Sequence, residues 1–328
     1  MKRWLFFILG IFISIFFGFI FFSDLDHKSI LNIVNTKKLS ILIYPTFFYF
    51  TGHIFRGIRW QYMLSKIKSN INVISCLQIY FAGMGLNNFL PFRIGDVFRI
   101  TSFNKKLSSI NKEILAGSLL LEKLIDISII FIIFLIGLLN MPKELIKEKI
   151  FYVNFNSIII FIILFSIFIW ILFVIIIKSN NKFIFLKKVE NWINNFIFYI
   201  KSFLDKLNNR NFIINIFLLS LTSWIFEAVA IYFIIKDNDN GINNFLASLF
   251  SMALGTLSTL IPSSPGYVGT FHYSIAKGFQ IFGISKVDSY SYALLVHSIF
   301  WISISTFGIV SFCSLFIYRN KKFNFKKN

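Results

Sequence analysis

Three uninterrupted apolar runs constrain this chain more than any other feature of its sequence. Residues 4–22, 155–177 and 289–318 contain no Asp, Glu, Lys or Arg, and they are 19, 23 and 30 residues long. About 20 apolar residues in a helix cross the roughly 30 Å hydrocarbon core of a bilayer. A core helix of a soluble protein would carry a polar face within such a run. The runs therefore predict an all-α integral membrane protein.

The remaining apolar stretches are of two kinds. We predict six full transmembrane helices, near residues 4–22, 39–57, 114–139, 155–177, 212–235 and 289–318. Residues 75–90 are too short for a simple span and end at Pro91, and residues 242–276 are broken in the middle by prolines. Because Pro removes a helix hydrogen bond, we expect both of these stretches to be re-entrant or broken helices.

The two breaks lie at corresponding places in the chain. Each follows a short apolar segment and precedes a span that carries polar groups, and the predicted topology opens one inward and the other outward. Interrupted helices at matching places in two halves of opposite topology indicate a binding site near the bilayer midplane. We therefore expect one polytopic membrane domain over residues 1–328, in an arrangement compatible with an inverted repeat of 1–139 and 155–318.

The basic residues predict the orientation. With the N-terminus inside, 23 of the 33 Lys and Arg residues lie in cytoplasmic segments and nine in outer loops. Because cytoplasmic loops are enriched in Lys and Arg, we expect a multi-pass protein of the cell (inner) membrane with both termini cytoplasmic. A net charge of +19 would suggest nucleic-acid binding in a soluble protein. Here the charge collects in loops between spans, so we expect no nucleic-acid partner.

One cytoplasmic segment has helical periodicity of its own. Apolar residues recur at helical spacing within residues 183–207, and lysines occupy the opposite face. This pattern predicts an amphipathic helix on the cytoplasmic leaflet, where anionic headgroups attract the lysines. The alternative is an ordinary loop helix packed on its own bundle.

The first candidate site follows the break at Pro91. Arg93, Gly95, Asp96 and Arg99 lie at expected membrane depth, where a charge is costly unless it is paired or hydrated. Arginine guanidinium groups offer bidentate donors to phosphate, so Arg93 and Arg99 are candidate phosphate ligands. The alternative is that they cap a hairpin at the interface and extend toward water.

Three acidic residues lie within predicted spans. Glu122 and Asp126 are four residues apart and share one helix face. At least one must be protonated or paired with a cation, and Arg93 or Arg99 are the expected partners. A proton relay and a purely structural ion pair both remain open. Glu227 is a third acid in mid-span, which could serve packing if it occurred alone.

The second break contains the other candidate site residues, Pro262, Pro265, Gly266, Gly269 and His272. Gly residues permit close approach of a ligand to the backbone, and the helix that begins near Gly269 would direct its positive dipole inward. His272 would lie in the first turn of that helix, where the dipole favours its neutral form. The alternative for His272, and the favoured interpretation for His297, is a neutral hydrogen-bonded side chain.

Four elements, in order, resemble the flippase-like membrane domain of lysylphosphatidylglycerol synthases. They are Arg56-x-x-Arg59-Trp60, Asn88-x-Leu90-Pro91-x-Arg93-x-Gly95-Asp96-x-x-Arg99, Glu122-x-x-x-Asp126 and Pro262-x-x-Pro265-Gly266-x-x-Gly269. The resemblance spans nearly the whole chain and includes stand-alone proteins that lack a synthase domain. Many relatives have Glu at the positions of Asp96 and His272, so a fixed charge role at His272 does not carry over.

The resemblance implies movement of a phosphate-bearing lipid between leaflets, with synthase activity in a separate soluble domain. We therefore expect a lipid translocase whose partner is a membrane phospholipid or lipid-linked substrate. The alternative is an accessory subunit or membrane-embedded enzyme that handles a lipid-linked sugar or aminoacyl-lipid, with a separate synthase or glycosyltransferase as partner. The sequence contains no nucleophile–base pair or metal-ligand cluster that would indicate catalysis, and we expect no cofactor.

Overall fold

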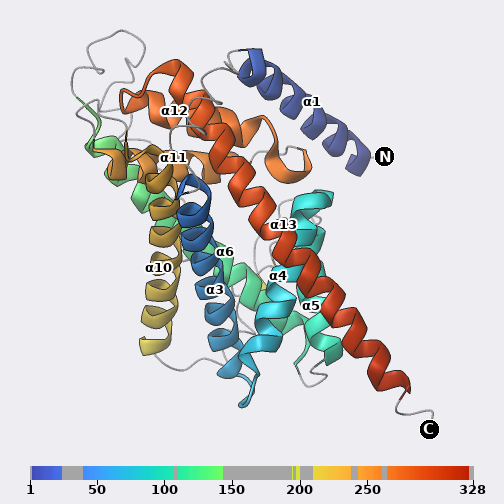
Figure 1. Cartoon of the computed structure of the whole chain (residues 1–328). Coiled ribbons are helices and arrows are strands. Elements are labelled where there is room, and N and C mark those ends of the chain that lie inside the picture. The colour runs from blue at the N-terminus through green and yellow to red at the C-terminus, as the bar shows by residue number, and fades with distance from the viewer. Residues whose placement is uncertain are drawn as a thin grey trace.

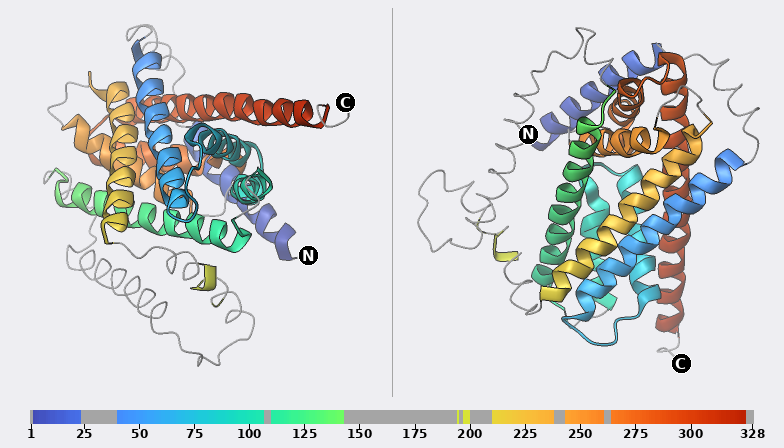
Figure 2. Two further views of the ribbon diagram at one scale, coloured as in Figure 1. Left: turned by 90° about the horizontal axis from the view of Figure 1, so that it is seen from below. Right: turned by 90° about the vertical axis from the view of Figure 1, so that its left-hand side faces the viewer.

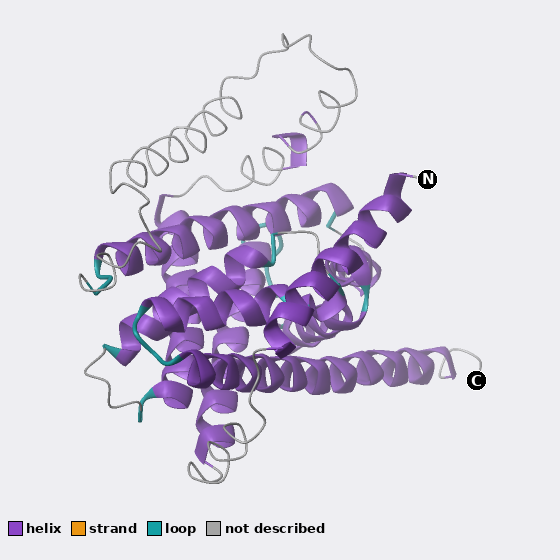
Figure 3. Cartoon of the chain, turned by 90° about the horizontal axis from the view of Figure 1, so that it is seen from above, coloured by secondary structure: helices purple, strands orange, loops and turns teal. Residues whose placement is uncertain are grey.

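The computed structural model of this chain describes residues 2–23, 40–106, 110–142, 194, 197–199, 210–237, 243–260 and 264–324. This part of the chain is helical and contains no strand (Figure 3). Its elements are α1 (Lys2–Ser23), α3 (Ser40–Ser65), α4 (Val73–Phe89), η1 (Pro91–Arg93), α5 (Ile94–Lys106), α6 (Lys112–Leu139), α10 (Arg210–Ile235), α11 (Asn244–Ser258), η3 (Pro265–Tyr267), α12 (Thr270–Ile281) and α13 (Lys286–Asn324).

Helices α1, α3, α6, α10 and α13 coincide with five of the six predicted spans. Two segments within them, Asn211–Ile235 and Lys286–Leu315, are long and apolar enough to cross a membrane by composition alone. The predicted span at 155–177 and most of the predicted amphipathic helix at 183–207 lie outside the described residues. One boundary was wrong: α3 continues past residue 57 to Ser65, so Arg56 and Arg59 lie within a helix and not in a cytoplasmic loop.

Both predicted broken elements are helical hairpins. In the first, α4 ends at Phe89, and the short helix η1 joins it to α5. In the second, α11 ends at Ser258, and η3 leads into α12. The α4–α5 pair lies toward the lower part of Figure 1, and the α11–α12 pair lies toward the upper part. The two hairpins thus approach the middle of the molecule from opposite ends.

The elements repeat at a constant spacing of 171 residues. Adding 171 to the bounds of α3, α4 and α6 gives 211–236, 244–260 and 283–310. These ranges begin within three residues of α10, α11 and α13, and α13 continues beyond its range to Asn324. The helix packing repeats in the same way. Helix α4 packs on α13, and their equivalents α11 and α6 pack on each other. Helix α3 packs on its own equivalent, α10. The views in Figures 1 and 2 both show α3 beside α10. The structure therefore has the organisation of an inverted repeat.

The buried apolar side chains form two main clusters, one around each hairpin. The larger lies among α6, α10, α11, α12 and α13, and the smaller among α3, α4, α5 and the start of α6. The backbones of α4 and α13 approach most closely at Gly85 and Gly308, where a Cβ on Gly85 would lie 2.8 Å from the Cα of Gly308. Small residues at such crossings allow close helix packing within a membrane.

We expect Gly85→Val to destabilise the protein by about 1–3 kcal/mol, because the added side chain forces α4 and α13 apart. The measurement is thermal or denaturant unfolding in detergent micelles. Ile309→Val is the control, since Ile309 lies beside the crossing and is 53% exposed. Equal unfolding midpoints for Gly85→Val and the unsubstituted protein would contradict this account of the helix packing.

Candidate functional site

Two buried arginines of α3 bind acids from other helices. Arg56 donates to the Glu227 carboxylate of α10 at 2.6 Å. Arg59 holds both carboxylate oxygens of Asp126 of α6, at 2.5 and 3.0 Å. Arg59 also lies 3.5 Å from Glu122, one turn earlier on α6. Because a buried charge without a partner is strongly unfavourable, these contacts join α3, α6 and α10 into one network.

The third buried arginine connects the first hairpin to the same network. Arg99 of α5 donates to both oxygens of Glu122, at 3.2 and 3.0 Å. Its guanidinium group also lies 4.3 Å from the centre of the Trp60 ring and 5.0 Å from that of Tyr80. The side chain is fully buried, so its charge is satisfied by a carboxylate and by aromatic faces.

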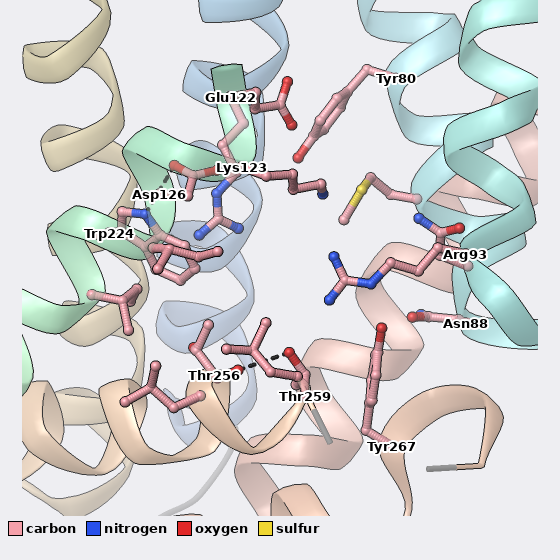
Figure 4. A pocket seen from close by; sticks show the side chains of 17 residues that line it. Tyr80, Asn88, Arg93, Glu122, Lys123, Asp126, Trp224, Thr256, Thr259 and Tyr267 are labelled. Carbon is pink, nitrogen blue, oxygen red and sulfur yellow. Dashed lines mark hydrogen bonds between the residues drawn. The ribbon is translucent and has the colours of Figure 1, made fainter. Parts of the chain in front are cut away.

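A cavity of about 410 Å³ lies beside this network, between the tips of the two hairpins. Its walls come from α3, α4, η1, α6, α10, α11 and η3, and from the residues that follow α11. Its polar lining consists of Arg56, Tyr80, Asn87, Asn88, Arg93, Glu122, Lys123, Asp126, Trp224, Thr256, Thr259 and Tyr267. Figure 4 shows that Arg93 and Lys123 extend into this space from opposite walls, with Tyr267 below Arg93. A pocket of this size with convergent polar groups is typical of a small-molecule or headgroup site.

Arg93 differs from the other cations around this cavity. Arg56, Arg59, Arg99 and Lys123 each lie within 4 Å of a carboxylate, whereas Arg93 forms no ion pair with any described residue. The four paired cations match four carboxylates, those of Asp96, Glu122, Asp126 and Glu227. The site therefore has one uncompensated positive charge, at Arg93, and this charge favours an anionic ligand.

The backbone conformations at the two hairpin tips are also unusual. Arg93 has a φ of 51° and Tyr267 a φ of 57°, and both side chains line the cavity. A non-glycine residue in this left-handed region costs about 1–3 kcal/mol, and such residues cluster at ligand sites. Together these strained positions direct one cation and one hydroxyl group into the same space.

The other predicted residues of the first hairpin lie around the cavity wall. Gly95 packs against α4, where an added Cβ would overlap the carbonyl oxygen of Gly83. Asp96 lies 3.6 Å from Lys123 and 3.8 Å from Arg99. Arg99 does not line the cavity, because both of its terminal nitrogens bind Glu122. Of the two arginines predicted as phosphate ligands, Arg93 therefore lines the cavity and Arg99 does not.

The second hairpin contributes its tip to the cavity and its remaining predicted residues to packing. Pro262 lies outside the described residues, and Pro265 begins η3. Gly266 adopts a φ of 71°, which glycine accommodates without strain, and packs against Trp301. Gly269 packs against α1, close to the backbone of Ser14 and Gly18.

His272 joins a chain of hydrogen bonds behind the cavity. The amide of Gly269 donates to His272 Nδ1 at 3.2 Å, and His272 Nε2 lies 2.9 Å from His297 Nδ1. His297 Nε2 lies 2.8 Å from the carbonyl oxygen of Gly266. Because His272 Nδ1 accepts from the Gly269 amide, the proton of a neutral His272 lies on Nε2 and is donated to His297 Nδ1. His297 then carries its own proton on Nε2, which donates to the Gly266 carbonyl oxygen. Both rings are neutral in this arrangement and tie η3 to α13.

Several residues of the cavity lining and of the adjacent ion-pair network were missed in the sequence. Arg56 and Arg59 entered only through the family resemblance, and Lys123, Trp224 and Tyr267 were not singled out as site residues. Arg56 and Arg59 had a usable signal, because they lie on one face of an otherwise apolar stretch. Among the described residues there is no group of three or more His, Cys, Asp or Glu side chains placed to hold a metal ion.

Comparisons with known proteins agree with this architecture. A family profile described as lysylphosphatidylglycerol synthase TM region matches residues 7–308. A curated relative, a UPF0104 membrane protein of Methanocaldococcus jannaschii, is 26% identical over 230 residues, which cover 70% of this chain and 93% of the relative. No solved structure matches the chain.

We expect Glu122→Gln to destabilise the protein by about 3–5 kcal/mol, because it leaves buried Arg99 without its carboxylate and weakens the hold on Arg59. Denaturant unfolding in micelles measures the change. Glu113→Gln, an exposed acid at the start of the same helix, should change the unfolding free energy little. Equal effects of the two substitutions would show that the ion-pair network does not stabilise the fold.

We expect His297→Leu to loosen the second hairpin, because the Gly266 carbonyl loses its donor, a loss that costs about 1–3 kcal/mol for a buried group. Hydrogen exchange followed by mass spectrometry should show faster amide exchange in residues 264–272. Thr306→Val, an exposed change on the same helix, is the control. Unchanged protection of 264–272 in His297→Leu would rule out this role of the histidine chain.

Proposed function

Because this chain belongs to the lysylphosphatidylglycerol synthase transmembrane-region family, we propose that it is a lipid translocase that accepts the phosphate of a membrane lipid in the cavity between its two hairpins. The observation that carries the proposal is Arg93, an uncompensated cation that lines a cavity otherwise balanced in charge. A guanidinium group matches the oxygens of a phosphate through parallel hydrogen bonds.

The inverted repeat supports movement in addition to binding. In transporters, a site between opposed broken helices can be exposed to either side by rocking one repeat against the other. Here the walls of the cavity come from both repeats, including Asn88 of the first hairpin and Thr259 of the second. These two residues occupy equivalent positions in the two repeats, 171 residues apart, so the cavity is shared by the two halves.

We extend the proposal to location and partners. Removing the three buried arginines from the cytoplasmic count of 23 leaves 20 basic residues against nine, which still supports cytoplasmic termini in a cell (inner) membrane. The profile describes the membrane region of a synthase. On that basis we propose that a synthase or glycosyltransferase supplies or consumes the lipid.

The test is lipid movement in proteoliposomes that contain a fluorescently labelled anionic phospholipid, with a membrane-impermeant quencher added outside. We expect Arg93→Gln to slow movement about tenfold or more, because a hydrogen bond to a charged group contributes about 1.5–3 kcal/mol. Lys112→Gln, an exposed change on α6, should leave the rate unaltered. Transport by Arg93→Gln at the unsubstituted rate would refute the proposal, and so would formation of a modified lipid without movement.

A further inference from the structure

Lys123 is the second cation that extends into the cavity. It follows Glu122 on α6, and its ammonium group lies 3.6 Å from the Asp96 carboxylate. The side chain is 32% exposed, whereas those of Arg59 and Arg99 are fully buried. Figure 4 shows its amino end directed into the space that Arg93 faces from the other side. Lys123 is therefore held less tightly than the arginines and faces the ligand space.

Asp96 is the partner that holds Lys123, and all of its own contacts are long. It accepts from the Asn87 side-chain amide at 3.3 Å and lies 3.8 Å from Arg99, which is already committed to Glu122. Asp96 does not line the cavity, whereas Lys123 does. The Lys123 side chain thus lies between the Asp96 carboxylate, which is outside the cavity, and the cavity itself.

We propose that Lys123 is a second oxyanion-binding group, which exchanges the Asp96 carboxylate for a phosphate oxygen when the cavity is occupied. The phosphate would then be held between Arg93 of the first hairpin and Lys123 of α6. This inference rests on the proposed function and names a residue that the family resemblance did not supply. A lysine suits such an exchange, because its ammonium group is a compact charge on a flexible stem with rotatable donors.

In this exchange Asp96 opposes the binding of the phosphate. Asp96 and the incoming phosphate compete for the same ammonium group, so the carboxylate weakens anion binding and favours release. Removal of its charge should therefore strengthen binding, although Asp96 belongs to the motif that carries the family resemblance. A carboxylate with a purely structural role would give the opposite sign or no effect.

The experiment is isothermal titration calorimetry of the full chain in detergent, with dihexanoyl phosphatidylglycerol as the probe. We expect Lys123→Gln to weaken binding about tenfold, since it removes one hydrogen bond to a charged group. Asp96→Asn should strengthen binding severalfold, and Lys112→Gln should leave it unchanged. In the double variant Asp96→Asn/Lys123→Gln, the gain from Asp96→Asn should disappear, because it acts through Lys123.

Three results would overturn the inference. They are unchanged binding by Lys123→Gln, weaker binding by Asp96→Asn, or a gain from Asp96→Asn that persists in the double variant. Melting temperatures of the variants identify any loss of fold. Inorganic phosphate serves as the second probe, and equal affinity for it would assign the site to a free oxyanion and overturn a lipid ligand. Failure of the proposed function is distinguishable, because then the unsubstituted protein itself would neither bind the lipid probe nor move lipid in vesicles.

Discussion

Three buried arginines are held by three carboxylates from other helices, and the arrangement of the bundle follows from these pairs. A lone charge in a low-dielectric interior is so unfavourable that each arginine must remain with its acid. Arg56 therefore binds α3 to α10, Arg59 binds α3 to α6, and Arg99 binds the first hairpin to α6. Breaking one pair leaves two groups unsatisfied, so the network resists separation of these elements.

The network also sets the charge around the cavity. The surrounding carboxylates pair with four cations, and Arg93 is the cation of the described lining that has no ion pair. Arg93 is presented by a strained backbone at the hairpin tip. Such strain persists only where the surrounding packing imposes it. Here the close contact of Gly95 with α4 helps to fix the turn that precedes it.

The two repeats hold their hairpins by different chemistry. The first hairpin is bound to α6 through the Arg99–Glu122 ion pair, and the second is bound to α13 through the neutral chain of His272 and His297. The equivalence of the halves is visible in the pair Arg56–Glu227, whose members are separated by the repeat spacing of 171 residues. The two halves of the repeat therefore share one order of helices but hold their hairpins by an ion pair in one half and by neutral hydrogen bonds in the other.

The sequence by itself determined the class of the protein, the positions of α1, α6, α10 and α13, and both hairpin breaks. These features depend on local properties, namely runs of apolar residues and the lost hydrogen bond at Pro91 and in the second break. The tertiary structure alone decided the partners of each charge. From the sequence, both Arg93 and Arg99 were expected partners of the acids of α6. In the structure Glu122 binds Arg99, Asp126 binds Arg59, and Arg93 forms no ion pair with a described residue. Pairing depends on which helix faces are brought together across the bundle, and linear spacing along the chain does not contain that information.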